Sequence, residues 1–233
     1  EKRREEVRNL IAAQEKLTDE ISAALDGAAT VTEIEDIYRP FRPKRKTRAS
    51  IAREKGLEPL AEAIYAQSAD SPAPLEMATA YINDEKGVAT AEDALKGALD
   101  IIAENISDDA DIRRRLRNLF TVIGNVEVTA ADKNAESVYT MYYEFSEPVS
   151  KIAGHRVLAI DRGEREKFLK VSVTLDPVKA ANVITSATLN PNGSPCTEAV
   201  REAGADAYER LIYLSIEREI RNMLTEKAAA HEN

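Results

Sequence analysis

Apolar positions repeat with the period of an α-helix along most of the chain. In the first 25 residues they recur three, four and seven positions apart, the spacing that places side chains on one face of a helix. These positions are Val7, Leu10, Ile11, Leu17, Ile21 and Leu25. The pattern predicts two helices with a break near Thr18.

A third helix is expected to begin at a capping box. Thr32 and Glu35 have the spacing at which each side chain can bond the backbone amide of the other. The positions that this helix would bury before Pro40 are Ile34, Ile37 and Tyr38. After a proline-containing loop, ASIAREK predicts a helix closed by Gly56. Further helices are expected in LEPLAEAIYA, PLEMATAYI, TAEDALKGALDIIAENI and DDADIRRRLRNLF.

Two segments change to an alternation of apolar and polar residues, which is typical of a strand buried on one face. They lie near residues 125–130 and 167–175, in NVEVT and FLKVSVTL, and we expect them to form a small antiparallel sheet. Between them a short helix is expected from about Gly154 to Arg162, ended by Gly163. Another helix should begin at Pro177, and a long amphipathic helix should begin near Asp206.

Composition agrees with this pattern. Nine glycines, nine prolines and 5% aromatic residues in 233 positions favour helices, because sheets normally use more β-branched, aromatic and turn residues. The predicted fold class is therefore mainly α, with one small antiparallel β-sheet. We divide the chain into a helical region over 1–124, a small α+β region over 125–205, and a terminal helix over 206–233. Because the first residue is not Met and the terminal helix stops without a clear terminator, we expect a fragment of a longer protein, with a downstream domain missing after the terminal helix.

Cysteine and histidine are scarce. One cysteine and two histidines exclude a disulfide framework and leave little for a zinc site. No apolar run approaches the roughly 20 residues that span a bilayer, and the first residues lack the apolar core of a signal peptide. We expect a cytoplasmic protein with no membrane partner.

The familiar catalytic motifs are absent from the sequence, including a P-loop, G-x-G-x-x-G, HExxH and G-x-S-x-G. His155 has no acid or nucleophile partner in its motif, so we interpret it as structural. Cys196 could be a nucleophile beside a positive helix terminus, but a small apolar filler is the simpler interpretation. Asp108, Asp109 and Asp111 favour capping of a helix over binding of a cation. We predict no enzymatic activity, no cofactor and no metal.

Positive charge is concentrated between Arg39 and Lys55, in a chain with a formal net charge of -9. A phosphate backbone is the usual partner of such a run, through charge-assisted hydrogen bonds. Distant acidic residues are screened over about 8 Å at physiological salt. The predicted nucleic-acid-binding residues are Arg42, Lys44, Arg45, Lys46, Arg48 and Arg53. The same run could be a solvated loop or could pair with acidic helices of the chain, and its composition favours neither interpretation.

A second basic run comprises Arg113, Arg114, Arg115 and Arg117. On a helix these positions spread around the circumference, where they can pair with nearby aspartates. We interpret this run as structural.

Residues 36–61, DIYRPFRPKRKTRASIAREKGLEPLA, resemble the signature of the Tex family, bacterial RNA-binding transcription accessory proteins. A proline-spaced basic loop that leads into IAREKGLEPLA is not a generic helix pattern, which makes this segment specific. Three later segments follow the pattern of the same family in the same order. They are ALDIIAENISDDADIRRRLR (98–117), FSEPVSKIAGHRVLAIDRGERE (145–166) and LSIEREIRNMLTEKA (214–228).

The resemblance implies a multihelical N-terminal region that serves as the scaffold of a longer protein. In that family an RNase H-like domain, helix-hairpin-helix elements and an OB-fold RNA-binding domain follow, and these 233 residues include none of them. We predict a non-catalytic scaffold that binds RNA or DNA backbones without sequence specificity and has the transcription machinery as a second partner. The alternative is a protein-interaction scaffold that docks on other domains or on RNA polymerase. A third hypothesis, a metal-dependent nuclease, is disfavoured because no dispersed set of carboxylates can be named.

Overall fold

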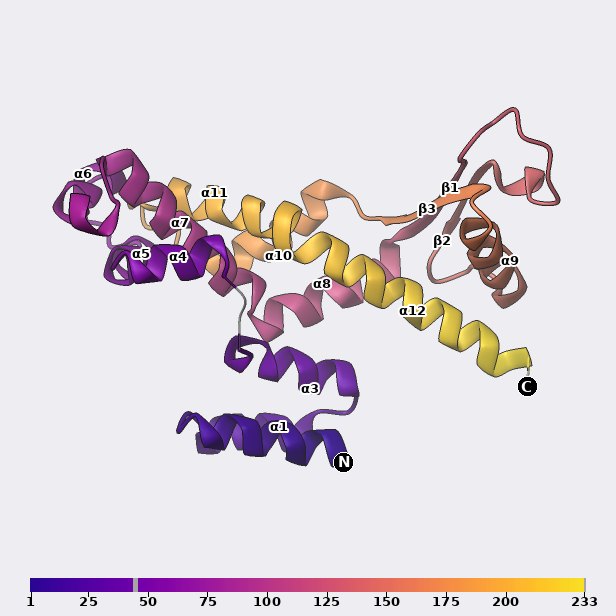
Figure 1. Ribbon diagram of the computed structural model, residues 1–233, viewed down its shortest axis with the longest axis horizontal. Helices are drawn as coiled ribbons and strands as arrows, with labels where there is room; N and C mark the ends of the chain where they lie inside the picture. Colours follow the sequence, from indigo (N-terminus) through magenta and orange to yellow (C-terminus); the bar gives the residue numbers. More distant parts are fainter. Residues whose placement is uncertain (44–45, 233) are drawn as a thin grey trace. The chain divides into compact units, whose positions relative to one another are not determined.

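The computed structural model describes residues 1–43 and 46–232. The fold is mainly α-helical with one small antiparallel sheet, which confirms the predicted fold class (Figure 1). The chain forms two compact units. One comprises Glu1–Arg114 and Ile184–Leu211, and the other comprises Arg115–Val183 and Ile212–Asn233. Each unit thus combines two separate stretches of chain, whereas the three ranges drawn from the sequence are consecutive.

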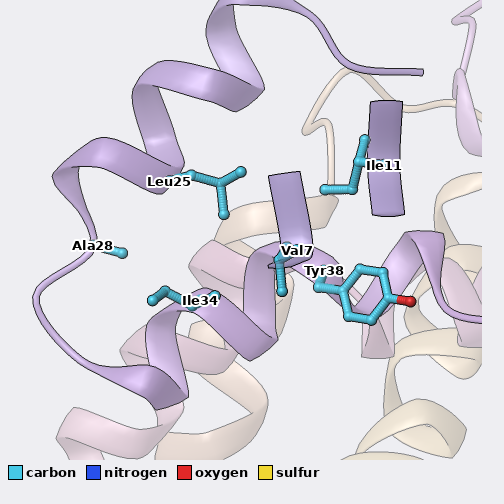
Figure 2. Close-up of a cluster of buried hydrophobic side chains, with 6 residues drawn as sticks. All are labelled: Val7, Ile11, Leu25, Ala28, Ile34 and Tyr38. Atoms are coloured by element: carbon cyan, nitrogen blue, oxygen red, sulfur yellow. The ribbon is translucent and has the colours of Figure 1, made fainter. Parts of the chain in front are cut away.

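The first unit begins with three helices, α1 (Lys2–Ala13), α2 (Asp19–Gly27) and α3 (Val31–Tyr38). Their shared core holds six buried side chains that come from all three helices and the residue after α2 (Figure 2). These are Val7, Ile11, Leu25, Ala28, Ile34 and Tyr38. Thr18 caps α2 by accepting a hydrogen bond from the Ile21 amide at 3.2 Å. The helix break predicted near Thr18 therefore coincides with a real helix start.

The cap of α3 lies two residues before the predicted one. Thr30, in extended backbone, accepts from the Glu33 amide at 3.2 Å, and the Glu33 carboxylate accepts from the Ala29 amide at 2.6 Å. Glu35, which we expected to complete a capping box with Thr32, instead bonds an arginine of α1. The prediction of Thr32 as the cap was wrong because the same Thr-to-Glu spacing occurs twice in this segment.

The rest of the first unit packs around α7 (Ala91–Ser107), which is contacted by α4 (Arg48–Glu54), α5 (Glu58–Tyr65), α6 (Pro74–Ala78) and α11 (Thr197–Asp206). Single 3-10 turns complete the unit: η1 (Arg39–Phe41), η2 (Thr79–Tyr81) and η3 (Asp84–Lys86). The buried face of α7 includes Ala94, Ala98, Ile101 and Ile102. Because two of these residues are alanines, neighbouring helices can approach α7 closely.

The second unit contains the sheet, in which β1 (Asn125–Ala130) lies between β2 (Glu144–Pro148) and β3 (Leu169–Thr174). Both pairings are antiparallel, with Val126 opposite Val173 and Val128 opposite Val171. β1 and β3 lie in the two segments where alternation predicted strands. β2, which follows the 3-10 turn η4 (Thr140–Tyr142), was not predicted.

Helix α9 (Gly154–Arg165) contacts β3 and α12 (Tyr213–Glu232). It continues past Gly163, which we expected to end it. A Cβ atom at Gly163 would lie 2.5 Å from Leu169 Cδ1 and 3.1 Å from Tyr139 Cδ1. Glycine is present here because the helix packs tightly, and the left-handed turn of a helix terminus is not involved.

At Val173, the outer edge of β3 is covered by two side chains of α12. The Val173 amide donates to Glu217 Oε2 at 2.8 Å, and the Val173 carbonyl accepts from the Tyr213 hydroxyl at 2.7 Å. Tyr213 and Glu217 lie four residues apart and therefore share one face of the helix. Both backbone groups of this strand position are thereby satisfied without a fourth strand.

The chain passes between the two units at three points, all of them helical. Two of these points lie within α8 (Ala110–Ile123) and α10 (Pro177–Thr188). The third lies in the π-helical segment η5 (Ala207–Ile212), which separates α11 from α12. The terminal helix predicted from Asp206 thus begins with a π-helical segment. None of the described helices is long and apolar enough to cross a membrane.

Candidate nucleic-acid interface

Arg42, the first predicted contact, lies directly after η1 and is held by α3. Its guanidinium bonds Glu35 and stands 5.7 Å from the centroid of the Tyr38 ring. Arg3 of α1 bonds the same carboxylate at 2.6 Å and stands 5.6 Å from the same ring centroid. Hydrogen bonding, first from Arg3 and then from Arg42, lowers the pKa of Glu35 although partial burial opposes it. The charge of Arg42 is therefore paired with a carboxylate of the same chain.

Lys44 and Arg45 lie outside the described residues. Lys46, the next cation, is exposed, and so is Arg48 at the first position of α4. Neither side chain forms a hydrogen bond or ion pair with any residue of 1–43 or 46–232. Of the predicted contacts in the described part of the chain, these two are exposed without a hydrogen-bonded or ion-paired carboxylate, although the charge of Arg48 also acts on Asp100.

The start of α4 is fixed by a reciprocal capping box. The Ser50 amide donates to Thr47 Oγ1 at 3.0 Å, and the Thr47 amide donates to Ser50 Oγ at 2.7 Å. The Thr47 hydroxyl also donates to Glu104 Oε2, 2.9 Å away on α7. The residue between Lys46 and Arg48 is thus attached to the central helix of the unit.

Arg53 has three partners within the chain. Its guanidinium donates to Glu58 at 2.8 Å, and to Glu104 and Asn105 at 2.9 Å each. Glu104 is buried, so the ion pair to Arg53 also compensates a carboxylate that has lost its water. Arg53 therefore acts as an internal clamp between α4 and α7, which is the second interpretation that the sequence left open.

The second basic run is engaged in intramolecular contacts. Arg113 is 1% exposed and donates to the Ser107 carbonyl. Arg114 pairs with Asp111 at 2.5 Å, and Arg117 with Glu219 at 2.8 Å. Asp109 accepts from the Ile112 amide at 2.8 Å, so it caps α8 as expected.

The two candidate nucleophile or base residues lie in separate units. Cys196 is buried in the first unit, with its sulfur 3.4 Å from Ser71 Oγ and 3.7 Å from Met77 Sδ. His155 is exposed in the first turn of α9, in the second unit. Over the described ranges, no three His, Cys, Asp or Glu side chains gather in an arrangement that could hold a metal ion.

Charge density in the sequence found the basic segment but not its anchors. Glu104 lies 51 residues from Arg53 and 57 from Thr47, within a helix whose sequence looks like an ordinary amphipathic one. No local signal distinguishes it from the other acidic residues of the chain. Only the packing of α4 on α7 reveals its role.

These observations define a class of protein, a mainly helical protein with a small antiparallel sheet and a short exposed basic segment. The family model described as Tex central region-like matches residues 69–232. The chain is 42% identical over 231 residues to the uncharacterized protein YdcI of Bacillus subtilis, covering 97% of this chain and 32% of that protein. The chain belongs to the Tex family.

Two further relatives extend the comparison. Protein tex of Bordetella pertussis is 38% identical over 168 residues, 71% of this chain and 21% of that protein. The human S1 RNA-binding domain-containing protein 1 is 28% identical over 233 residues, 94% of this chain and 23% of that protein. The chain thus spans about a third or less of the length of these relatives. The matching family model is described as a central region, whereas the sequence resemblance placed the chain in the N-terminal region.

Proposed function

We propose that this chain is a non-catalytic, nucleic-acid-binding scaffold segment of a cytoplasmic, Tex-like transcription accessory protein. The observation that carries the proposal is that some cations of the basic segment are paired within the chain while others are exposed. Arg42 and Arg53 are paired on α3 and α7, while Lys46 and Arg48 between them are exposed and unpaired within the described residues. An anchored segment with free cations loses little conformational entropy when it binds an anion.

The contacts would be to phosphates, which position a protein without reading base sequence. The names of two relatives support a partner of this class. One relative, from Neisseria gonorrhoeae, is called transcriptional accessory protein Tex, and the human relative is named for an S1 RNA-binding domain. RNA and DNA backbones both supply the phosphates, and the transcription machinery is the second proposed partner.

Salt dependence of binding tests the proposal. If four phosphates are neutralised, the slope of log affinity against log salt is roughly -3.6, a loss of about 150-fold between 50 and 200 mM salt. The double variant Lys46→Glu with Arg48→Glu should make the slope shallower, to about -1.8 or closer to zero. Affinity would then fall by only about 12-fold over the same range of salt. Binding would be measured by fluorescence anisotropy with single- and double-stranded RNA and DNA.

The matched control is Lys133→Glu with Lys227→Glu. Both lysines are exposed in the second unit and form no ion pair with a described residue, and the change in net charge is the same as in the test variant. The control should keep the wild-type slope. A control that weakens binding as much as the test variant would mean that net charge, and not this segment, governs the affinity.

The alternative is a protein-interaction scaffold, and the intramolecular pairing of Arg42 and Arg53 favours it. If the wild-type chain binds none of the four nucleic acids at 50 mM salt, the nucleic-acid proposal is overturned and the scaffold function replaces it.

The absence of catalysis is also part of the proposal. It is supported by the burial of the Cys196 thiol and by the separation of Cys196 and His155 into different units. Labelled RNA and DNA incubated with the chain in Mg²⁺ or Mn²⁺ should remain intact. Cleavage that disappears when one acidic residue is replaced would contradict this part of the proposal.

A further inference from the structure

A groove of about 470 Å³ lies between α4 and α7 in the first unit. Its apolar lining includes Ile51, Ala52 and Leu57. Three cations also line it: Arg48 at the start of α4, Lys55 at the C-terminal cap of α4, and Lys96 on α7. The exposed arginine of the basic segment is therefore also a wall of this groove.

A fourth cation, Lys86, reaches the same place from η3. The turns at Gly56 and Gly87 have φ angles of +80° and +82°, the left-handed conformation that favours glycine. A Cβ atom at Gly56 would lie 3.1 Å from Lys86 Nζ, and one at Gly87 would lie 3.7 Å from Lys55 Cε. Lys86 therefore lies over Gly56, and Lys55 lies over Gly87. Gly87 lines the groove, so both lysines lie at that edge of it.

None of these four cations forms a side-chain hydrogen bond or ion pair with a residue in the described ranges. In this respect they differ from the paired arginines Arg42 and Arg53. Gathering like charges costs electrostatic free energy, which the Asp100 carboxylate offsets in part for Arg48 and Lys96 and which a bound anion would offset further.

Two carboxylates also line the groove, Asp93 and Asp100. Asp100 lies 3.8 Å from Arg210, whose charge offsets it, and Asp93 is exposed. An adjoining hollow of about 370 Å³ shares Arg48, Lys96 and Asp100 but adds three acidic residues. These are Glu92, Glu202 and Asp206. An anion is therefore favoured at the end of the groove next to Lys55 and Lys86.

We propose that this groove is a second binding site for nucleic-acid phosphates, in which Lys86 and Lys96 extend the path that begins at Lys46 and Arg48. The inference rests on the proposed function, because Arg48 belongs to both surfaces and makes them continuous. No aromatic side chain is among the described residues that line the groove. It therefore offers no surface on which a base could stack and takes the sugar-phosphate backbone.

The test uses one variant that should weaken the binding of nucleic acid and one that should strengthen it. Lys86→Gln with Lys96→Gln removes two cations and should make the salt slope on a single strand less steep by about 1.4. Asp100→Asn removes a negative charge from the groove and should strengthen binding about twofold to fivefold at 50 mM salt. Both variants are measured by anisotropy with a fluorescent 24-nucleotide single strand, and thermal unfolding verifies that they fold. A misfolded variant would not gain affinity, so the second variant keeps the test independent of folding.

The matched control for the lysines is Lys133→Gln with Lys227→Gln, which should leave the slope unchanged. If Lys46→Glu with Arg48→Glu weakens binding but the two groove variants leave slope and affinity unchanged, the groove proposal fails and the proposed function stands. If the wild-type chain does not bind the strand at all, both fail.

Discussion

Glu104 shows how much of the basic segment depends on one residue outside it. This buried carboxylate accepts from Thr47, which caps α4, and from Arg53 in the last turn of the same helix. Both ends of α4 are therefore tied to one carboxylate of α7. Arg48 lies between these two attached residues in the sequence, at the first position of α4.

Replacing Glu104 by Gln should destabilise the chain by about 1 to 3 kcal/mol, because Arg53 loses a charged partner in a poorly solvated place. Chemical denaturation would measure the change. Glu62→Gln is the control, since Glu62 is exposed on α5 and has no partner among the described residues. Equal stability of the two variants would mean that the clamp contributes nothing.

At the scale of elements, close packing decides where helices and strands end. α9 passes through Gly163 because Leu169 and Tyr139 occupy the space that a side chain would need. β2 forms beside β1 although only Phe145 among its five residues is a large apolar side chain. Its Glu147 faces α9 and pairs with Arg156 at 2.9 Å, so an ion pair takes the place of an apolar contact.

Gly163→Ala should destabilise the second unit by about 1 to 3 kcal/mol, because the added methyl group would overlap Leu169. Gly27→Ala at the end of α2 is the matched control. No atom lies within 4 Å of its Cβ position, so alanine there should be neutral or slightly stabilising. Thermal unfolding of both variants tests the difference, and a neutral Gly163→Ala would disprove the packing explanation.

Val173→Asp should unfold the sheet more readily than Val171→Asp. Val173 is fully buried between β1 and α12, and an unpaired charge there loses its water. Val171 is only partly buried, so its aspartate keeps some solvent. We expect a loss of several kcal/mol at Val173 and a smaller loss at Val171. Near-ultraviolet circular dichroism and denaturation would rank the two variants, and the reverse order would contradict the deeper burial of Val173.

The sequence predicts those helices and strands that have a clear local pattern of apolar and polar residues. Alternation located β1 and β3, and periodicity located most helices. β2 was missed because EFSEP has too little alternation to distinguish it from a loop. Charge density found the basic segment, but the roles of Glu104, Lys86 and Lys96 depend on contacts between residues far apart in the chain.

At the scale of the whole molecule, the formal net charge of -9 coexists with a basic segment in which Arg42 and Arg53 are paired with carboxylates while Lys46 and Arg48 are exposed. Asp100 is partly buried and lies 3.8 Å from Arg210. Burial raises its pKa, although Arg210, Arg48 and Lys96 lower it, and Asp206 raises it further.

The raised pKa of Asp100 makes a pH prediction. A carboxyl group whose pKa is higher in the folded state contributes stability below its unfolded pKa and loses that contribution as the pH rises through the folded value. Asp100→Asn should therefore be more stable than the wild type at pH 7, by up to about 1 kcal/mol. The difference should shrink as the solution is acidified.

The control for the pH prediction is Asp93→Asn in the exposed part of the same groove. Melting temperatures between pH 4 and pH 8 would be compared for the wild type and both variants. A constant difference across this range, or a less stable Asp100→Asn at pH 7, would contradict the prediction.

The covered edge of β3 has a consequence for how this protein behaves at high concentration. An open sheet edge is a template on which a second molecule can add a strand, and such growth leads to aggregation. At Val173, Tyr213 and Glu217 bond the backbone groups that a second strand would need. The opposite edge belongs to β2, where the exposed Glu144 repels a like strand and Pro148 has no amide to donate. The sheet is therefore protected against self-association by a helix on one side and by charge and proline on the other.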